Sequence, residues 1–127
     1  MKRELTAHRA TPLNEVLRII VNDEPGAGGA NHSYSIEPTV GNAKGILIEF
    51  QKGGLQETGG VPNGASIEAL LAIVLDRLEG FQKGDFRCRE NALAFTHIEN
   101  GLMYLKKRTQ DRIARGVDCL LYTSRCV

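Results

Sequence analysis

The uneven distribution of glycine and proline along the chain is the feature that most restricts its fold. All four prolines and most of the 14 glycines lie between residues 1 and about 64, whereas residues 66 to about 116 have the apolar periodicity of helices. Glycine and proline are turn-forming residues that interrupt helices, so the first part is expected to hold short strands and turns. The sequence therefore predicts an α+β protein, with a small N-terminal antiparallel β-sheet over residues 1–64 and a two-helix antiparallel hairpin over residues 65–118.

Three segments of the first part have the pattern of β-strands. Alternating residues over 17–22 predict one strand, residues 33–37 a second that ends at Pro38, and residues 46–51 the most strand-like run of the chain. The glycine-rich stretches at 25–30 and 53–64 are expected to be flexible connections. Three short strands form a marginal sheet, so a helix or a partner chain is expected to cover one face.

The second part predicts two helices joined by a turn. Ser66 is expected to cap the first helix, whose apolar residues cover more than half its circumference, as in a helix buried on two sides. Gly80 and Gly84 are expected to end it, and Asp85 to cap the second helix. An apolar stripe on the second helix, suited to packing on the first helix or on another subunit, consists of Phe95, Ile98, Leu102 and Leu105.

Composition narrows the class of protein. The 127 residues fit one small domain, and a net charge of +1 argues against binding DNA through bulk positive charge. Cys88, Cys119 and Cys126 are odd in number and match no zinc pattern, so neither a disulfide framework nor a metal site is expected. No cofactor is predicted. No membrane span, signal peptide or catalytic constellation is recognisable, and the default expectation is a soluble cytosolic protein without enzymatic activity.

Several residues have a ligand-binding interpretation beside a structural one. The loop over residues 26–30 has the glycines of an anion-binding nest, although a plain connection is favoured. Arg108 and two further arginines share one side of the second helix, where they suit phosphate or offset the helix dipole in water. Phe81, expected in the turn between the helices, suits base stacking or core packing, and Asn91 suits a base edge or the surface. The candidate ligand-binding residues are Gly28, Gly29, Ala30, Phe81, Asn91, Arg108, Arg112 and Arg115.

The segment over residues 88–118 resembles the helical-hairpin domain of phage proteins that sequester nucleotide signals, a family with type 1 Thoeris anti-defence and type 2 anti-CBASS members. Residues 71–82 also fit this domain, and the glycine-rich segment over 23–32 is similar to the longer, Thoeris-type members. The resemblance covers about residues 13–118. The matching runs are Cys-Arg-Glu-Asn at 88–91, Ala-x-Thr-x-Ile-Glu at 94–99, Tyr-Leu-x-x-Arg-Thr-x-Asp-Arg at 104–112 and Arg-Gly-Val-Asp at 115–118.

The resemblance implies a non-catalytic sponge that acts in the host bacterial cytoplasm. Such a protein binds a cyclic ADP-ribose isomer intact, so that the defence effector is never activated. Members of the family form homo-oligomers, commonly hexamers built from dimers, with pockets between protomers. Some of them also hold cyclic di- or trinucleotides at separate sites.

The same resemblance assigns roles to the candidate residues. Phe81 is expected to stack on the adenine, Asn91 to hydrogen-bond a ribose or base edge, and Arg108 to hold the pyrophosphate. The loop over residues 26–30 is expected to close over the ligand. The two remaining candidate arginines are expected to form a second site for a cyclic oligonucleotide.

The last nine residues depart from the family pattern. The string over residues 119–127 is similar to a translated transposon end of the kind used to prepare sequencing libraries, so it is expected to be an assembly artefact. A genuine divergent tail is the alternative. Two other functions also stay open, a small nucleotide-processing enzyme and a nucleic-acid-binding helical hairpin that uses the arginines.

Overall fold

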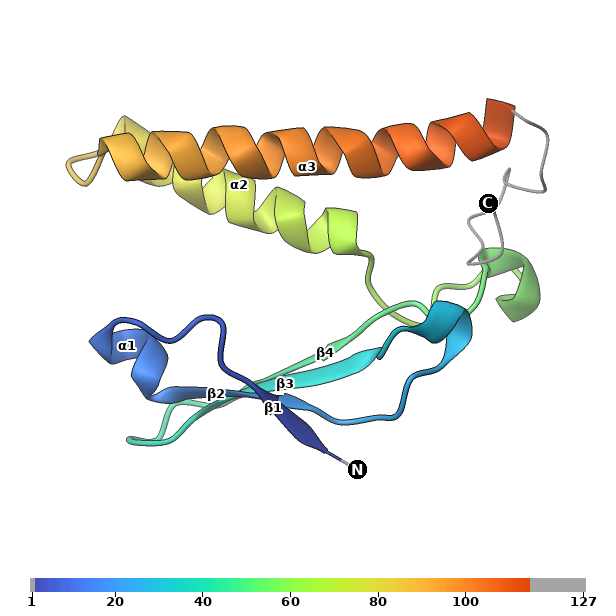
Figure 1. Cartoon of the computed structure of the whole chain (residues 1–127), viewed down its shortest axis with the longest axis horizontal. Helices are drawn as coiled ribbons and strands as arrows, with labels where there is room; N and C mark the ends of the chain where they lie inside the picture. The colour runs from blue at the N-terminus through green and yellow to red at the C-terminus, as the bar shows by residue number, and fades with distance from the viewer. Residues whose placement is uncertain (1, 115–127) are drawn as a thin grey trace. The chain divides into compact units, whose positions relative to one another are not determined.

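The computed structural model describes residues 2–114, apart from the side chains of residues 112 and 113. The chain forms two compact units, one that ends at Ala65 and one that begins at Ser66. An antiparallel sheet precedes a helical hairpin (Figure 1), which confirms the predicted α+β class. The expected artefactual tail at 119–127 lies outside the described residues.

The sheet has four strands in sequence order, each antiparallel to its neighbour. All three predicted strands are present, and a further strand, β1, was missed because its three residues are too few to show an alternating pattern. The strands are β1 (Arg3–Leu5), β2 (Leu17–Val21), β3 (Ser33–Pro38) and β4 (Ile46–Glu49).

The strand register divides the sheet into an apolar face and a mixed face. Val21 lies opposite Tyr34, which in turn lies opposite Ile48, so these three side chains share one face. Val21 is fully buried, and the ring of Tyr34 packs edge-on against Phe50 with the ring centroids 5.7 Å apart. Ile20, which is 8% exposed, lies on the opposite face. The most buried apolar residues of this unit thus lie at the C-terminal end of β2.

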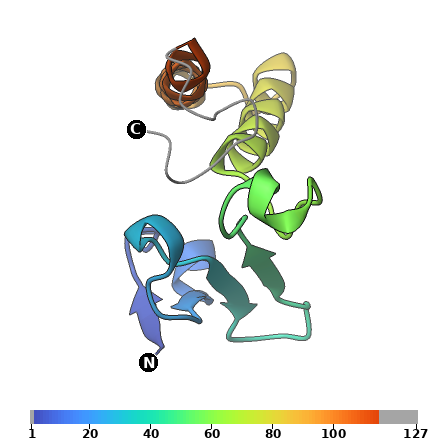
Figure 2. The same ribbon diagram turned by 90° about the vertical axis from the view of Figure 1, so that its right-hand side faces the viewer.

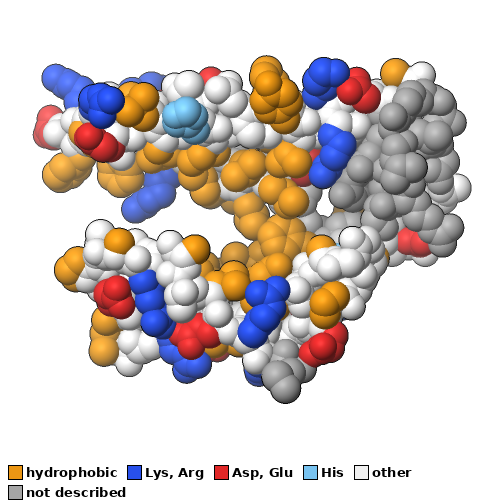
Figure 3. All heavy atoms as spheres, in the orientation of Figure 1, with side chains coloured by type: hydrophobic (Ala, Val, Ile, Leu, Met, Phe, Trp, Pro, Cys, Tyr) orange, Lys and Arg blue, Asp and Glu red, His pale blue; other side chains and the backbone are white. Residues whose placement is uncertain are grey.

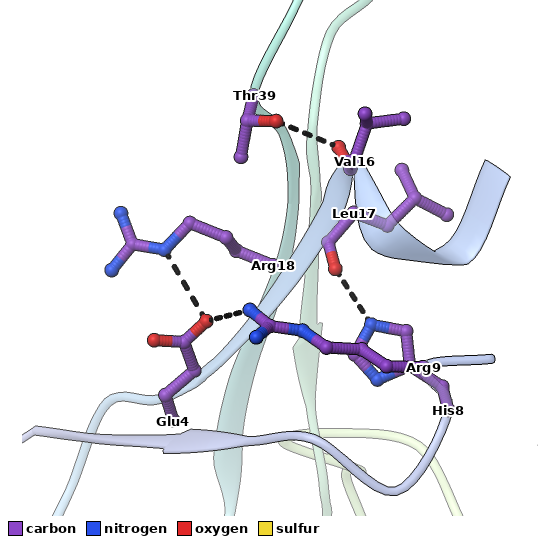
Figure 4. A network of polar contacts seen from close by, with 7 residues as sticks. All are labelled: Glu4, His8, Arg9, Val16, Leu17, Arg18 and Thr39. Carbon is purple, nitrogen blue, oxygen red and sulfur yellow. Dashed lines mark hydrogen bonds and ion pairs between the residues drawn. The ribbon is translucent and has the colours of Figure 1, made fainter. Parts of the chain in front are cut away.

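Polar contacts fix the edge strand β1, and the segment between it and the short helix α1 (Pro12–Glu15), to β2 (Figure 4). The Glu4 carboxylate accepts a 2.6 Å hydrogen bond from the Arg9 guanidinium and lies 3.6 Å from Nε of Arg18. Nε2 of His8 lies 2.6 Å from the carbonyl oxygen of Leu17. These contacts hold a segment for which the sequence shows no apolar periodicity.

The connection over residues 53–64 is more ordered than the expected flexible link. It contains a 3-10 turn, η2 (Leu55–Thr58), and the Glu57 carboxylate accepts the backbone N–H of Gly54 at 2.8 Å. The Asn63 side-chain oxygen accepts the backbone N–H of Lys52 at 2.8 Å, and Asn63 donates its own N–H to the Gln51 side chain at 2.9 Å. Side chains thus satisfy the backbone groups of a loop in which glycines suggested free movement.

The second unit is an antiparallel hairpin of α2 (Ile67–Lys83) and α3 (Arg89–Ala114), which pack along each other (Figure 2). Ser66 caps α2 as predicted, because its Oγ accepts the N–H of Ala69 at 3.0 Å. The predicted cap of the second helix at Asp85 is wrong. The Gln82 side chain accepts the N–H of Cys88 at 3.0 Å, and the Cys88 sulfur accepts the N–H of Asn91 at 3.4 Å, so α3 begins only after Cys88.

The apolar stripe predicted on the second helix is the side of α3 that is half-buried. Its four residues are all half-buried, whereas Leu93, Met103 and Tyr104 of the same helix are 41%, 52% and 66% exposed. The expectation that the first helix is buried on two sides is not met within one chain, because Ile73 is 65% exposed. Figure 3 shows such hydrophobic side chains on the visible surface of the hairpin.

The cap at Ser66 gives a direct stability test. Replacing Ser66 with Ala removes the acceptor for the Ala69 N–H and should lower the free energy of unfolding by about 1 kcal/mol. Replacing Ser66 with Asp keeps an acceptor and should retain most of the stability. Urea unfolding followed by circular dichroism measures both, and equal stability of Ser66→Ala and the wild type would contradict the capping assignment.

Candidate functional site

The predicted ligand-binding residues fall into separate regions of the structure. The glycine loop belongs to the first unit, and the other candidates belong to the hairpin. Within the hairpin, Phe81 and Asn91 lie beside the turn that joins the helices, whereas Arg108 lies toward the far end of α3. Asn91 and Arg108 are 17 residues apart in one helix, which is about 25 Å at 1.5 Å per residue. The base and the phosphate of one nucleotide are joined by a single ribose, so these two residues of one chain cannot hold the same nucleotide.

Phe81 lies in the last turn of α2 and not, as expected, in the turn between the helices. Helix α2 continues through Gly80 to Lys83, because that glycine keeps a helical conformation at a modest cost in propensity. The Phe81 ring is half-buried, and the guanidinium carbon of Arg77 lies over it, 5.0 Å from the ring centroid. Sequence reasoning missed Arg77, although an Arg–Phe pair four residues apart in a helix is a recognisable signal.

Asn91 lies in the first turn of α3, as predicted, and is half-buried. Its side-chain nitrogen donates to the carbonyl oxygen of Phe86 in the turn at 3.5 Å. This distance is long for an N–H···O hydrogen bond, so the bond is weak. The amide group is therefore able to exchange this contact for a ligand at low cost.

Arg108 is part of the contact between the helices. It is half-buried, and its guanidinium lies 3.8 Å from the Glu68 carboxylate in the first turn of α2. Nε of Arg108 and Oγ1 of Thr109 have no hydrogen-bond partner among residues 2–114. Of the other two candidate arginines, Arg112 is described only as backbone within α3, and Arg115 lies outside the described residues. That the three guanidinium groups lie on one side of α3 therefore stays a prediction.

The glycine loop folds back on itself. It contains a 3-10 turn, η1 (Ala27–Gly29), in which Gly28 and Gly29 have φ of 72° and 84°. These left-handed conformations favour glycine, which explains the glycine pair. The N–H of Gly26 donates to the carbonyl of Ala30 at 2.8 Å, and that of Gly29 to the carbonyl of Gly26 at 2.9 Å. Two of the backbone donors expected to meet an anion are thus used inside the loop.

Asp23 anchors the start of this loop to its end. Its carboxylate accepts the backbone N–H of His32 at 3.0 Å, and its carbonyl accepts the side-chain nitrogen of Asn31 at 2.6 Å. Burial alone would raise the pKa of Asp23, but hydrogen bonds from the His32 and Ser33 backbone and the Asn31 side chain outweigh burial and lower it. The charged form of Asp23 is therefore part of the folded loop.

An open hollow of about 400 Å³ lies elsewhere, on the first unit. Its lining combines acidic and basic side chains, and Glu4 there is already paired with Arg18. None of the predicted ligand-binding residues contributes to it. It is lined by Lys2, Arg3, Glu4, Arg18, Ile20 and Glu37.

The described part of the chain offers neither a metal-binding cluster nor a membrane-spanning helix. Among residues 2–114, no three His, Cys, Asp or Glu side chains gather in a way that could hold a metal ion. Within the same part of the chain, no helix has the length and apolar character needed to cross a membrane.

The hairpin and its neighbouring segment define the class of the protein. Residues 42–110, more than half of the chain, match the family model described as "Acb2/Tad1, hairpin domain", and the chain belongs to this family. The matched range contains Phe81, Asn91 and Arg108, whereas the glycine loop and the last two candidate arginines lie outside it.

A curated relative gives a more particular comparison. The chain is 42% identical over 93 residues to the protein named Thoeris anti-defense 1 of Bacillus phage SBSphiJ7. The matched region covers 73% of this chain and 63% of the relative, so the chain spans less than two thirds of the relative's length. The resemblance noted in the sequence is thereby confirmed at the level of the family.

The charge of Asp23 makes a pH-dependent prediction. Because its pKa is lowered in the folded protein, Asp23 contributes stability above its ordinary value of 3.8, and this contribution is lost as the pH falls through the lowered value. The His32 and Ser33 amide signals in NMR should therefore titrate with a midpoint below 3.8. Asp23→Asn should abolish this titration, and a midpoint above the ordinary value would contradict the assignment.

The Glu68–Arg108 pair should contribute little to stability. Because the two side chains are 26% and 35% exposed and the closest approach is 3.8 Å, solvent screens their attraction. A double-mutant cycle of Glu68→Gln and Arg108→Gln, measured by urea unfolding, should give a coupling energy below about 1 kcal/mol. A coupling above about 2 kcal/mol would show that the pair locks the hairpin and leaves Arg108 no freedom to meet a ligand.

Proposed function

We propose that this protein is a phage anti-defence sponge that binds a cyclic ADP-ribose-type messenger in the cytoplasm of the infected host. The observation that carries the proposal is the family match over residues 42–110, which contains the stacking ring and its neighbouring amide at one end of the hairpin. The name of the phage relative, which specifies action against Thoeris defence, supports the same role. The messenger is sequestered, and the defence effector is left without its activator.

The turn end of the hairpin supplies two of the contacts that such a ligand needs. In this proposal the half-buried ring of Phe81 stacks on the adenine, and stacking contributes ~1–3 kcal/mol. The weakly bound amide of Asn91 turns to a ribose or base edge. These contacts recognise parts of the ligand that stay unchanged, so the messenger is held without being cleaved.

The distance along α3 favours an oligomer with composite sites. Arg108 is able to meet the pyrophosphate of a ligand held by Phe81 and Asn91 only if it comes from a second copy, because about 25 Å separates the two ends within one chain. Exposed apolar side chains on the hairpin, such as Ile73 and Tyr104, suit contacts between copies. We propose a homo-oligomer, and specifically a hexamer built from dimers.

The arginine end is the candidate for a second ligand class. Arg112 and Arg115, spaced three residues apart, are proposed to bind a cyclic di- or trinucleotide of the kind used in CBASS signalling. In the assembled protein the glycine loop is proposed to cover the messenger, although two of its donors are already used. Nucleic-acid binding by the same arginines is the competing function, and it predicts an affinity for single strands that weakens steeply with salt.

Native mass spectrometry with a panel of cyclic nucleotides tests the ligand and the assembly together. The full chain should bind a cyclic ADP-ribose isomer with a fixed ratio of ligand to protomer in a hexameric species. Heating the complex should return the ligand with its mass unchanged. Recovery of a cleaved product would support a nucleotide-processing enzyme, and failure of every cyclic nucleotide to bind would refute the sponge.

Variants at the two ends of the hairpin provide the matched control. Phe81→Ala should weaken messenger binding by about 10- to 100-fold, the equivalent of one lost base stack. It should leave the binding of a cyclic trinucleotide unchanged, because that ligand is assigned to the arginine end. Equal losses for both ligands would mean that the variant unfolds or that the two sites are one.

A further inference from the structure

The Phe81 ring carries a guanidinium that the proposed function has not used. Arg77, one turn earlier on α2, lies over the ring with its guanidinium carbon 5.0 Å from the centroid. The Arg77 side chain is exposed, and it makes no ion pair with another residue in the range 2–114. Its charge is therefore held beside the ring without a carboxylate to neutralise it.

The other cations near this end of the hairpin are differently placed. Lys83 lies 3.5 Å from Glu79, and Arg89 lies 3.7 Å from Glu90, so each has an acidic partner. Arg87 lies in the turn, and among the described residues only Arg77 stacks on the ring. Arg108 of the same chain lies about 25 Å from Asn91 along α3, toward the other end of the hairpin.

We propose that Arg77 binds the phosphate of the nucleotide whose base stacks on Phe81. This assignment rests on the proposed function and adds a phosphate contact from the same chain as the stacking ring. A guanidinium on an aromatic ring uses its flat face for stacking and keeps the N–H groups of its edge for hydrogen bonds. Arg77 is therefore able to stay on one face of the ring while the base takes the other and the edge meets a phosphate bidentately.

The contact with the Phe81 ring pre-organises Arg77 for binding a phosphate. An arginine that is free in solvent loses rotamer freedom when it binds a phosphate, whereas one already held on a ring loses less. The phosphate lies one ribose away from the stacked base, which matches a guanidinium held 5.0 Å from the centroid of the stacking ring. The ligand class that fits is a purine nucleotide with at least one phosphate, and a free nucleoside lacks the group that Arg77 would bind.

Calorimetric titration of the full chain with a cyclic ADP-ribose isomer tests the proposal. Arg77→Gln should weaken binding by about 10- to 100-fold, as expected for a lost charged hydrogen bond. Arg77→Lys keeps the charge without the planar group and should have an intermediate affinity. The matched control is Arg89→Gln, which removes a paired arginine at the same end and should change the affinity by less than about 2-fold.

Titration with adenosine by NMR separates phosphate binding from simple orientation of the ring. If Arg77 binds phosphate, Arg77→Gln leaves adenosine affinity unchanged, whereas an orienting role would weaken adenosine and nucleotide equally. Wild-type affinity for the nucleotide in Arg77→Gln, or an equal loss for adenosine, overturns the assignment and leaves the sponge intact. If the wild-type protein binds no cyclic ADP-ribose isomer, the proposed function and this assignment fail together.

Discussion

The straight length of α3 is the constraint on which the rest of the hairpin depends. A hydrogen-bonded helix of 26 residues cannot shorten, so it fixes Asn91 near the turn and Arg108 toward the opposite end. Any ligand assigned to these two residues of one chain must span the distance between them. In the proposed function one nucleotide is held at one end of the hairpin, and a site that uses both residues requires a second copy of the chain. The length of this helix therefore limits which residues can share a ligand, and it is the reason for proposing an oligomer.

Packing between α2 and α3 uses one side of each helix and leaves the other available. The half-buried stripe of α3 leads directly to Arg108, three residues after Leu105, so this arginine is at once a packing residue and a candidate phosphate ligand. Glu68 neutralises it in the free chain, and the weakness of a solvent-screened pair is what would allow a phosphate to replace the carboxylate. A strong pair at this point would stabilise the hairpin and block the site.

Sequence reasoning was most accurate where a repeating pattern extends over many residues. The strands around Ile19 and Ile48 and the stripe on α3 could be predicted from periodicity, because each further apolar residue at the same spacing indicates the same kind of element. It failed where one local interaction decides the backbone. Packing outweighs the helix propensity of Gly80, and the Gln82 side chain holds the turn that was expected to become helical at Asp85. The contact of Arg77 with Phe81 was within reach of the sequence, since four residues separate the pair in a helix.

The proposed contacts favour retention of a ligand over its conversion. Stacking on Phe81 and a hydrogen bond from Asn91 engage the base and the ribose, which differ little between an intact nucleotide and the transition state for cleavage of its pyrophosphate. Interactions of equal strength in both states lower the free energy of the bound ligand without lowering the barrier to reaction. An enzyme must place its strongest contacts where charge develops during bond breaking. A ring and an amide directed at the base and the ribose meet the opposite requirement, which is long residence of an intact messenger.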